Sequence, residues 1–311
     1  MRAFRGDSIA GDLLDYHFGF GAFGPARRGK RLRPRLLTAV TRAEGGDDAK
    51  ALLAAAAVEM LHNYSLIHDD IEDRDELRHG KPALWKRFGL AQALNAGDAL
   101  CAASFLTLAE SKSGYPPERV LRMIEVLHGA HGVMCDGQSM DLAFEEAEFV
   151  TLSNYERMIA GKTAALFGAA CEIGALCAAA DLEAARAYRS VGRAYGLAFQ
   201  IRDDVLGIWA SSDATGKVGA TDIARRKWTF PVVWALSLAH SPARDAIASA
   251  YAARSPLSAG KVDAVVDALD TLRAREAAES AIEAHLDGVR GHEAPEVRAY
   301  LASTLDARLT A

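Results

Sequence analysis

Residues 51–82 read ALLAAAAVEMLHNYSLIHDDIEDRDELRHGKP. The first half is apolar at helical spacing and predicts a core helix, which we place at about 48–72. The second half carries six carboxylates in the eight positions from Asp69 to Glu76, followed at once by three basic side chains. Charge of this density is normally a solvated surface, because isolated charges are costly to bury. Its attachment to the end of a core helix therefore needs an explanation.

The whole chain has the composition of a large helical globular protein. Half of its 311 residues are hydrophobic, a quarter are charged and only 9 are proline, which favours helices around a large buried core. Apolar residues recur at helical spacing almost everywhere, and no long linker or internal repeat divides the chain. We predict an all-α protein with one domain over residues 1–311. The predicted helices lie at about 33–43, 48–72, 91–112, 117–147, 152–178, 182–209, 220–239, 243–254, 260–289 and 293–309.

Charge, cysteine content and hydropathy limit the possible partners and compartments. The net charge of −5 argues against nucleic acid as a partner, because that binding needs a basic surface. The first residues carry no signal-peptide pattern, and no uninterrupted apolar run reaches the length of a membrane span. We expect a cytoplasmic protein without stable membrane insertion, with buried and reduced thiols. The cysteines are Cys101, Cys135, Cys171 and Cys177.

The first acidic cluster contains two aspartates with helical spacing. Asp69 and Asp73 are four positions apart, so on a helix they lie on one face with their Cβ atoms about 5–6 Å apart. The two carboxylates repel each other, and the dipole at a helix C-terminus disfavours them further. Carboxylate oxygens suit Mg²⁺ or Ca²⁺. A divalent metal site and a solvated helix end neutralised by Arg74 both remain possible at this point.

A second acidic pair closes another apolar helix. Asp203 and Asp204 follow the apolar stretch YGLAFQIR, with Gln200 on the same face. A buried unpaired carboxylate would be very costly, so two such helices are hard to explain as solvated faces. If they face each other, the four aspartates form a cage for several metal ions beside an apolar cavity. The predicted ligand is a phosphate ester with a hydrophobic tail.

These motifs resemble those of the trans-isoprenyl diphosphate synthases. DDIED at 69–73 matches the family's first aspartate-rich motif, and FQIRDDVLG at 199–207 resembles the second. The resemblance implies an isoprenoid synthase-type helical bundle around a central apolar cavity, which condenses isopentenyl diphosphate with an allylic diphosphate. Further matching segments, in family order, are RGKRLRP at 28–34, HNYSLIHDD at 62–70, ELRHGKP at 76–82, GD at 97–98, GQSMDLAFE at 137–145, AGKTAALF at 160–167 and TGKVGATDIARRKWTFP at 215–231.

The resemblance also implies roles for individual residues in ionising the allylic diphosphate. Asp69 and Asp73 would hold two Mg²⁺ ions and Asp203 a third, with Asp70 and Asp204 as auxiliary ligands and Mn²⁺ as a possible substitute. Charge neutralisation of the leaving pyrophosphate would be the main catalytic effect. The residues that would contact the allylic diphosphate directly are Arg78, Lys162 and Lys217.

A second diphosphate site is implied for isopentenyl diphosphate. Lys30, Arg33 and His62 match the family residues for it, and arginine suits forked recognition of phosphate. Taken alone, GKRLRP would be read as a surface basic patch. The remaining implied positions are Thr163 and Gln200, which would steady the carbocation or relay the proton, Lys227, which would face a diphosphate, and Phe199, which would line the cavity and would otherwise be read as core.

The sequence departs from the family pattern at two positions. Gly207 replaces the usual third aspartate of the second motif, and His79 replaces the second arginine of Arg-Arg-Gly. Histidine is cationic only when protonated, so isopentenyl diphosphate binding is expected to be weaker or more sensitive to pH. Asp203 is the more important ligand in the family, so we expect activity to survive the change at Gly207.

Product length is set in the family just upstream of the first aspartate. Tyr64 lies five positions before Asp69, where a bulky side chain would stop a growing tail at modest depth because a helix rises 1.5 Å per residue. The first motif has no two-residue insertion and its aromatic residue is at the fifth upstream position, a combination that resembles the geranylgeranyl synthases. The resemblance implies a twenty-carbon product, geranylgeranyl diphosphate, with the fifteen-carbon farnesyl diphosphate as alternative.

Two further alternatives are a low-activity partner subunit of a heteromeric synthase and a class I terpene cyclase. The cyclase usually carries a second metal motif that residues 203–211 do not supply, and it needs no second diphosphate site. From the resemblance we also expect a homodimer.

Overall fold

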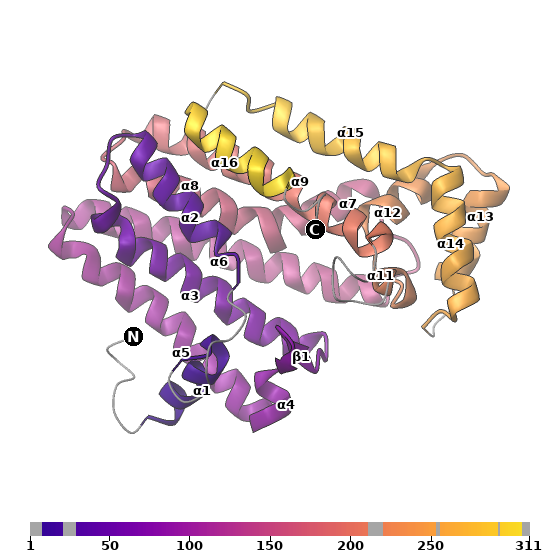
Figure 1. The fold of residues 1–311 in the computed structure, drawn as a ribbon, viewed down its shortest axis with the longest axis horizontal. Helices are drawn as coiled ribbons and strands as arrows, with labels where there is room; N and C mark the ends of the chain where they lie inside the picture. The colour runs from indigo at the N-terminus through magenta and orange to yellow at the C-terminus, as the bar shows by residue number, and fades with distance from the viewer. Residues whose placement is uncertain (1–7, 21–28, 211–219, 253–255, 292, 307–311) are drawn as a thin grey trace. The chain divides into compact units, whose positions relative to one another are not determined.

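The computed structural model describes residues 8–20, 29–210, 220–252, 256–291 and 293–306 (Figure 1). Within these ranges the regular structure is helical apart from one two-stranded hairpin of β1 (Leu77–Arg78) and β2 (Lys81–Pro82), which confirms the all-α prediction. In chain order the helices are α1 (Ile9–Phe18), α2 (Leu32–Ala43), α3 (Asp48–Glu72), α4 (Leu84–Phe88), α5 (Leu90–Ala109), η3 (Glu110–Ser113), α6 (Pro117–Glu145), α7 (Leu152–Ile159), η4 (Ala160–Ala164), α8 (Ala165–Cys177), α9 (Leu182–Trp209), α11 (Thr221–Ala224), α12 (Phe230–Ser237), α13 (Pro242–Tyr251), α14 (Ala259–Thr271), α15 (Ala274–Asp287) and α16 (Pro295–Asp306).

The chain forms two compact units. Unit 1 comprises residues 1–128 and 172–185, and unit 2 comprises residues 129–171 and 186–311. The boundaries between them fall inside or at the ends of helices α6, α8 and α9. The expectation of one domain over the whole chain stays a prediction.

Unit 1 is built around the long helix α3. Its start at Asp48 follows from the N-cap Asp47, whose side chain accepts a hydrogen bond from the backbone N–H of Ala49 at 2.8 Å, as expected for an aspartate cap. The helix packs along α5, and α2 packs against it (Figure 1). A buried apolar cluster joins α1, α3, α4 and α5, so the acidic end of α3 is held on a packed scaffold. The buried members of this cluster are Leu13, Leu14, Tyr16, Ile67, Leu84, Ala93, Ala96 and Leu100.

The hairpin β1–β2 follows α3 and lies against α1. His79 and Gly80 form its two-residue turn with φ of 54° and 80°, and both positive values are typical of a type I′ hairpin turn. The Tyr16 hydroxyl donates to the carbonyl of Pro82 at 2.8 Å, and the Lys81 ammonium donates to the carbonyls of Tyr16 and His17. Neither α1 nor the hairpin is predicted from the sequence, and each is stabilised by the other.

Unit 2 has its own core and contains a π-helical turn. The stretch predicted as one helix at 152–178 is helical, but it is α7 and α8 joined by the π turn η4. A π turn inserts an extra residue into the helix and is frequently found at functional sites. The core of unit 2 draws buried side chains from α7, α9, α12, α13, α14 and α15.

The helical stretch Leu152–Cys177 is long and apolar enough to cross a membrane by length and composition alone. Charged residues interrupt this stretch, so it contains no uninterrupted apolar run of that length. Of the apolar window in this stretch, 89% is buried inside the protein, as in the core helix of a soluble protein.

Three other expectations are wrong in detail. The helix expected at 220–239 is two helices, because the chain turns at Arg226 with φ of 56° and α12 restarts with a proline in its first turn. The helix expected at 260–289 breaks where Arg273 takes φ of 58°. Cys135 is exposed and Cys101 half-buried, whereas Cys171 and Cys177 are buried; none of these four described cysteines is in a disulfide.

Candidate functional site

The end of α3 presents Asp69 and Asp73 on one face. Asp73 is the C-cap residue, and its backbone N–H donates to the carbonyl of Asp69 at 2.8 Å, so the helical spacing extends to the second carboxylate. Both side chains are half-buried. Among the described residues no group of three His, Cys, Asp or Glu side chains is placed to hold a metal ion. The chemistry of this oxygen donor pair nevertheless fits Mg²⁺, which typically takes one or two carboxylates and keeps several waters.

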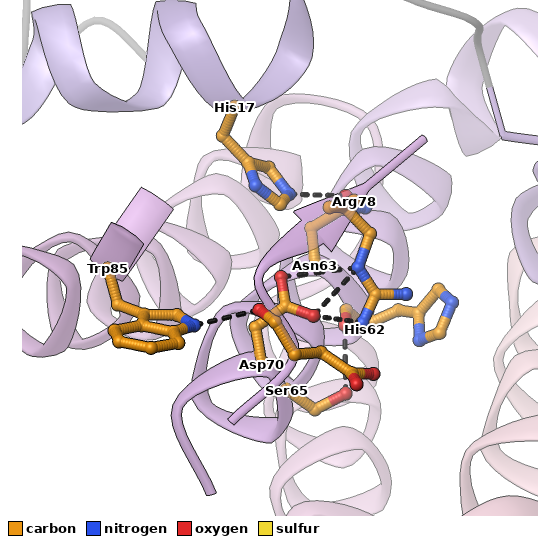
Figure 2. A network of polar contacts seen from close by, with 8 residues as sticks. His17, His62, Asn63, Ser65, Asp70, Arg78 and Trp85 are labelled. Carbon is orange, nitrogen blue, oxygen red and sulfur yellow. Dashed lines mark hydrogen bonds and ion pairs between the residues drawn. The ribbon is translucent and has the colours of Figure 1, made fainter. Parts of the chain in front are cut away.

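Asp70 has a different environment from its two neighbours. Its side chain is only 2% exposed and is held by Arg78 of β1, whose Nε lies 2.9 and 3.2 Å from the two carboxylate oxygens and whose terminal nitrogen also bonds one of them (Figure 2). Burial raises the pKa of Asp70, and the Arg78 guanidinium opposes this shift. Burial would lower the pKa of Arg78, but the bonds and charge of Asp70 raise it overall. This arrangement favours a positioning role for Asp70 over the auxiliary metal role expected from the sequence.

Arg33 of α2 and His62 of α3 are brought together in unit 1. The guanidinium Nη1 lies 3.1 Å from Nε2 of His62. Because a guanidinium only donates hydrogen bonds, Nε2 must accept and the ring proton is on Nδ1. Burial, helped by the charges of Arg33 and Arg78, lowers the pKa of His62 well below its usual value. His62 is therefore a neutral orienting partner of Arg33, and Lys30 lies exposed just before α2.

His17 of α1 belongs to the same basic region and is missed by the sequence analysis. Its Nε2 lies 3.0 Å from Oδ1 of Asn63, which is on α3 beside His62 (Figure 2). Burial, together with the charges of Lys81, Arg78 and His79, lowers the pKa of His17 to about 4, although the hydrogen bond to Asn63 opposes this shift. Because His17 comes from a segment remote in sequence, no motif identifies it.

In unit 2 the π turn carries Lys162 and Thr163. The ammonium of Lys162 forms an ion pair with Asp141 of α6 at 2.5 Å. The two backbones approach closely enough that a Cβ at Gly137 would lie 2.1 Å from the amide nitrogen of Lys162, so this position must be glycine. Asp141 lies within the quoted GQSMDLAFE segment, but the sequence gives no sign of its pairing with Lys162.

Thr163 starts a chain of hydrogen bonds that ends on Asp204. Its hydroxyl donates to Oε1 of Gln200 at 2.7 Å, and Nε2 of Gln200 donates to Asp204 at 3.1 Å. Asp204 also accepts from the Tyr155 hydroxyl and from the backbone N–H of Phe230 at 2.8 Å. Burial raises the pKa of Asp204 to about 6, although these bonds oppose the shift. Asp204 thus ties α7, α9 and α12 together, and its expected role as an auxiliary metal ligand stays a prediction.

Asp203 and Gly207 lie one turn apart on α9, and Asp222 of α11 fills the space beside Gly207. A Cβ at Gly207 would lie 2.2 Å from Oδ2 of Asp222. The carboxylate that the second motif lacks at 207 is therefore replaced in space by one from a segment fifteen positions later. Asp203 is half-buried and Asp204 buried, so only the first of the pair keeps contact with solvent.

The remaining expected residues have mixed environments. Phe199 is buried in an aromatic cluster with Phe167 and Tyr195, at ring-centroid distances of 5.2 and 5.9 Å. His79 and Lys227 are exposed, and Tyr64 is half-buried. The expected diphosphate contact at Lys217 lies outside the described residues.

Solved structures of prenyl synthases share this fold. The polyprenyl synthetase from Streptomyces coelicolor A3(2) superposes with a TM-score of 0.88 and 31% identity, covering 98% of this chain and 93% of that one. The class defined by the fold and by the two aspartate-bearing helices is therefore the all-α isoprenoid synthase type.

The chain belongs to the polyprenyl synthetase family, whose model matches residues 24–269. It is similar to the geranylgeranyl diphosphate synthase of Methanosarcina mazei, with 43% identity over 205 residues that cover 66% of this chain and 63% of the relative. It is also similar to that of Mycobacterium tuberculosis, with 40% identity over 256 residues that cover 81% of this chain and 72% of the relative. A (2E,6E)-farnesyl diphosphate synthase and a geranylfarnesyl diphosphate synthase are among the other relatives. These matches confirm the resemblance found in the sequence.

Proposed function

We propose that the protein is a Mg²⁺-dependent prenyltransferase that condenses isopentenyl diphosphate with an allylic diphosphate. The observation that carries the proposal is the combination, in a member of this family, of an aspartate pair at the end of α3 with the adjoining basic groups Arg33, His62 and Arg78. The aspartate pair offers ligands for metal ions, and the basic groups offer hydrogen-bond donors for phosphate oxygens.

The allylic diphosphate is proposed to bind through carboxylate-held Mg²⁺. Asp69 and Asp73 would supply ligands at the end of α3, and Asp203 keeps the metal-binding role that the second motif implies. Magnesium bound there would neutralise the diphosphate and so favour cleavage of the allylic C–O bond. Arg78, oriented by Asp70, would donate to the phosphate oxygens. Lys162 keeps the diphosphate-binding role that its motif implies and is oriented by Asp141 within unit 2.

Isopentenyl diphosphate is proposed to bind at the basic groups of unit 1. His62 accepts one hydrogen bond from Arg33 and thereby fixes the guanidinium plane, which leaves other donors of the fork for phosphate oxygens. Lys30 and His79 add positive charge at exposed positions, His79 only when it is protonated.

The carbocation stage is assigned to the Thr163–Gln200 pair. Because Nε2 of Gln200 points to Asp204 and the Thr163 hydroxyl donates to Oε1, the amide dipole is held in one orientation. A fixed polar group costs no reorganisation when charge develops nearby.

The favoured product is geranylgeranyl diphosphate. Two of the relatives described above are named for this product, and Tyr64 stands where its ring would limit the depth available to the tail. Tyr64→Ala should lengthen the product, and an unchanged product on chromatography would contradict this assignment.

The assembly is proposed to be a cytoplasmic homodimer. Several large apolar side chains of α5 and α6 are exposed in unit 1, among them Phe105, Leu106 and Leu121 at 39, 54 and 59%, and a second copy would cover them. Light scattering after size exclusion tests this, and a monomer at micromolar concentration would contradict it.

One incubation separates the candidate functions. The purified protein is mixed with Mg²⁺ and dimethylallyl, geranyl or farnesyl diphosphate, with and without isopentenyl diphosphate, and products are identified by mass. Elongated diphosphates formed only with isopentenyl diphosphate support the synthase. A hydrocarbon formed without it supports a cyclase, and no turnover in any mixture supports a partner subunit.

A further inference from the structure

His68 lies on α3 between the product-length residue Tyr64 and the first aspartate. Its side chain is 18% exposed, and its ring packs edge-on against Tyr64 with centroids 4.7 Å apart and an interplanar angle of 60°. The two residues are four positions apart, and helical side chains lean toward the N-terminus of their helix. The imidazole therefore covers the turn that carries Tyr64.

The opposite side of the imidazole is set into helix α5 at Gly97. A Cβ at Gly97 would lie 2.3 Å from Nε2 and 2.4 Å from Cδ2 of His68, so any other residue there would displace the ring. The same nitrogen lies 3.4 Å from the carbonyl of Leu94 and 3.8 Å from a carboxylate oxygen of Asp98. The ring is thus set against α5, and it also packs against the ring of Tyr64.

We propose that His68 is a positioning residue for product length, which acts by holding the ring of Tyr64 in place. This rests on the proposed function, because it requires that Tyr64 limits the growing tail. Tyr64 is half-buried and packs against the apolar cluster of unit 1, and the ring of His68 lies against its own from the next turn of α3. With His68 truncated, the space above Gly97 opens and the Tyr64 ring gains room to turn away from the tail.

The test compares product lengths rather than rates. Wild type, Tyr64→Ala, His68→Ala and the double variant are each given farnesyl diphosphate and excess isopentenyl diphosphate, and the ratio of products longer than twenty carbons to the twenty-carbon product is measured. We expect His68→Ala to raise this ratio several-fold. The double variant should match Tyr64→Ala alone, because His68 acts through Tyr64. His68→Phe, which keeps a flat ring against Tyr64, should retain the wild-type ratio.

Each outcome decides a separate point. If Tyr64→Ala lengthens the product and His68→Ala leaves it unchanged, the role of His68 is wrong while the role of Tyr64 stands. If Tyr64→Ala itself changes nothing, both are wrong. A double variant with longer products than Tyr64→Ala also overturns the proposal, since His68 would then act independently.

A second pair of variants keeps the test valid if His68→Ala does not fold. Gly97→Ala should push the ring toward Tyr64 and change the product ratio or lower the melting temperature, and His68→Ser in the Gly97→Ala chain should relieve the clash. A Gly97→Ala variant with wild-type melting temperature and product ratio would show that the ring is not set against α5, and would overturn the proposal.

Discussion

Replacing Asp204 by alanine should destabilise the protein much more than replacing its neighbour Asp203. The carboxylate of Asp204 is 7% exposed and accepts hydrogen bonds from Tyr155, Gln200 and the backbone of Phe230. Alanine leaves these donors without an acceptor, and each unsatisfied buried donor costs about 1–3 kcal/mol. Removing a buried carboxylate offsets part of this cost. We expect a net loss of about 2–4 kcal/mol for Asp204→Ala and less than about 1 kcal/mol for Asp203→Ala.

The assay is urea unfolding followed by circular dichroism at pH 7 in the presence of a chelator. With a slope of about 2–3 kcal/mol per molar urea, the Asp204→Ala midpoint should fall by about 1 M while that of Asp203→Ala stays near wild type. Turnover should separate the two variants differently from stability. Asp203→Ala should lose turnover although it remains folded. Equal midpoints for the two alanine variants, or a larger loss for Asp203→Ala, would refute the assignment of Asp204 as a structural residue.

A pH series adds an independent check of the same residue. Burial raises the pKa of Asp204 to about 6, so between about pH 4 and pH 6 the folded protein retains a proton that the unfolded chain releases. The contribution of Asp204 to stability therefore falls as the pH rises through this window. The stability of wild type minus that of Asp204→Asn should decrease by about 2–3 kcal/mol from pH 4 to pH 6 and then level off. A flat difference would contradict the raised pKa.

Other consequences of the structure can be checked separately. Gly207→Asp, which restores the family's usual residue, should lower the melting temperature by several degrees because its Cβ would lie 2.2 Å from Asp222, and Asp222→Ala should recover it. The contribution of His17 to stability should fall by about 2 kcal/mol as the pH falls from 6.5 to 4.5, since its pKa is lowered to about 4 and the unfolded chain takes up the proton first; the stability of wild type minus that of His17→Gln in urea titrations measures this contribution. His79→Arg should lower the apparent KM for isopentenyl diphosphate several-fold at pH 8, and an unchanged or raised KM would contradict the role assigned to that side chain.

The fold could be predicted wherever helices are long and periodic. Helices α3 and α9 match the expected ranges 48–72 and 182–209, because a long apolar stripe and strong end signals determine them locally. The ten-residue helix α1 is not predicted, because a helix this short is marginal alone and depends on its contacts with Lys81 and Pro82. The break at Arg273 is also hidden, since a positive φ at arginine is set by tertiary packing rather than by residue type.

The candidate site could be predicted as far as its motifs extend. The carboxylates of α3 and α9 are recognisable from spacing alone, and the basic residues become recognisable through the family pattern. The differences between Asp69 and Asp70, and between Asp203 and Asp204, are not visible in the sequence, because neighbours on a helix face directions about 100° apart and only the fold decides which one is buried. Asp222 and His17 are missed for the same reason: their segments reach the site only in three dimensions.

The contacts between α1 and the β1–β2 hairpin also constrain how relatives of this protein can diverge. Tyr16 and His17 are held by groups of Lys81 and Pro82, and the same hairpin carries Arg78. A substitution on one side therefore shifts the other unless it is matched. Across the family, positions 16 and 81 should accordingly vary together, since the Lys81 ammonium also lies over the Tyr16 ring. Positions 17 and 82 take part only through backbone carbonyls and are free to vary. A grafted hairpin would need its own first helix in order to keep Arg78 on Asp70.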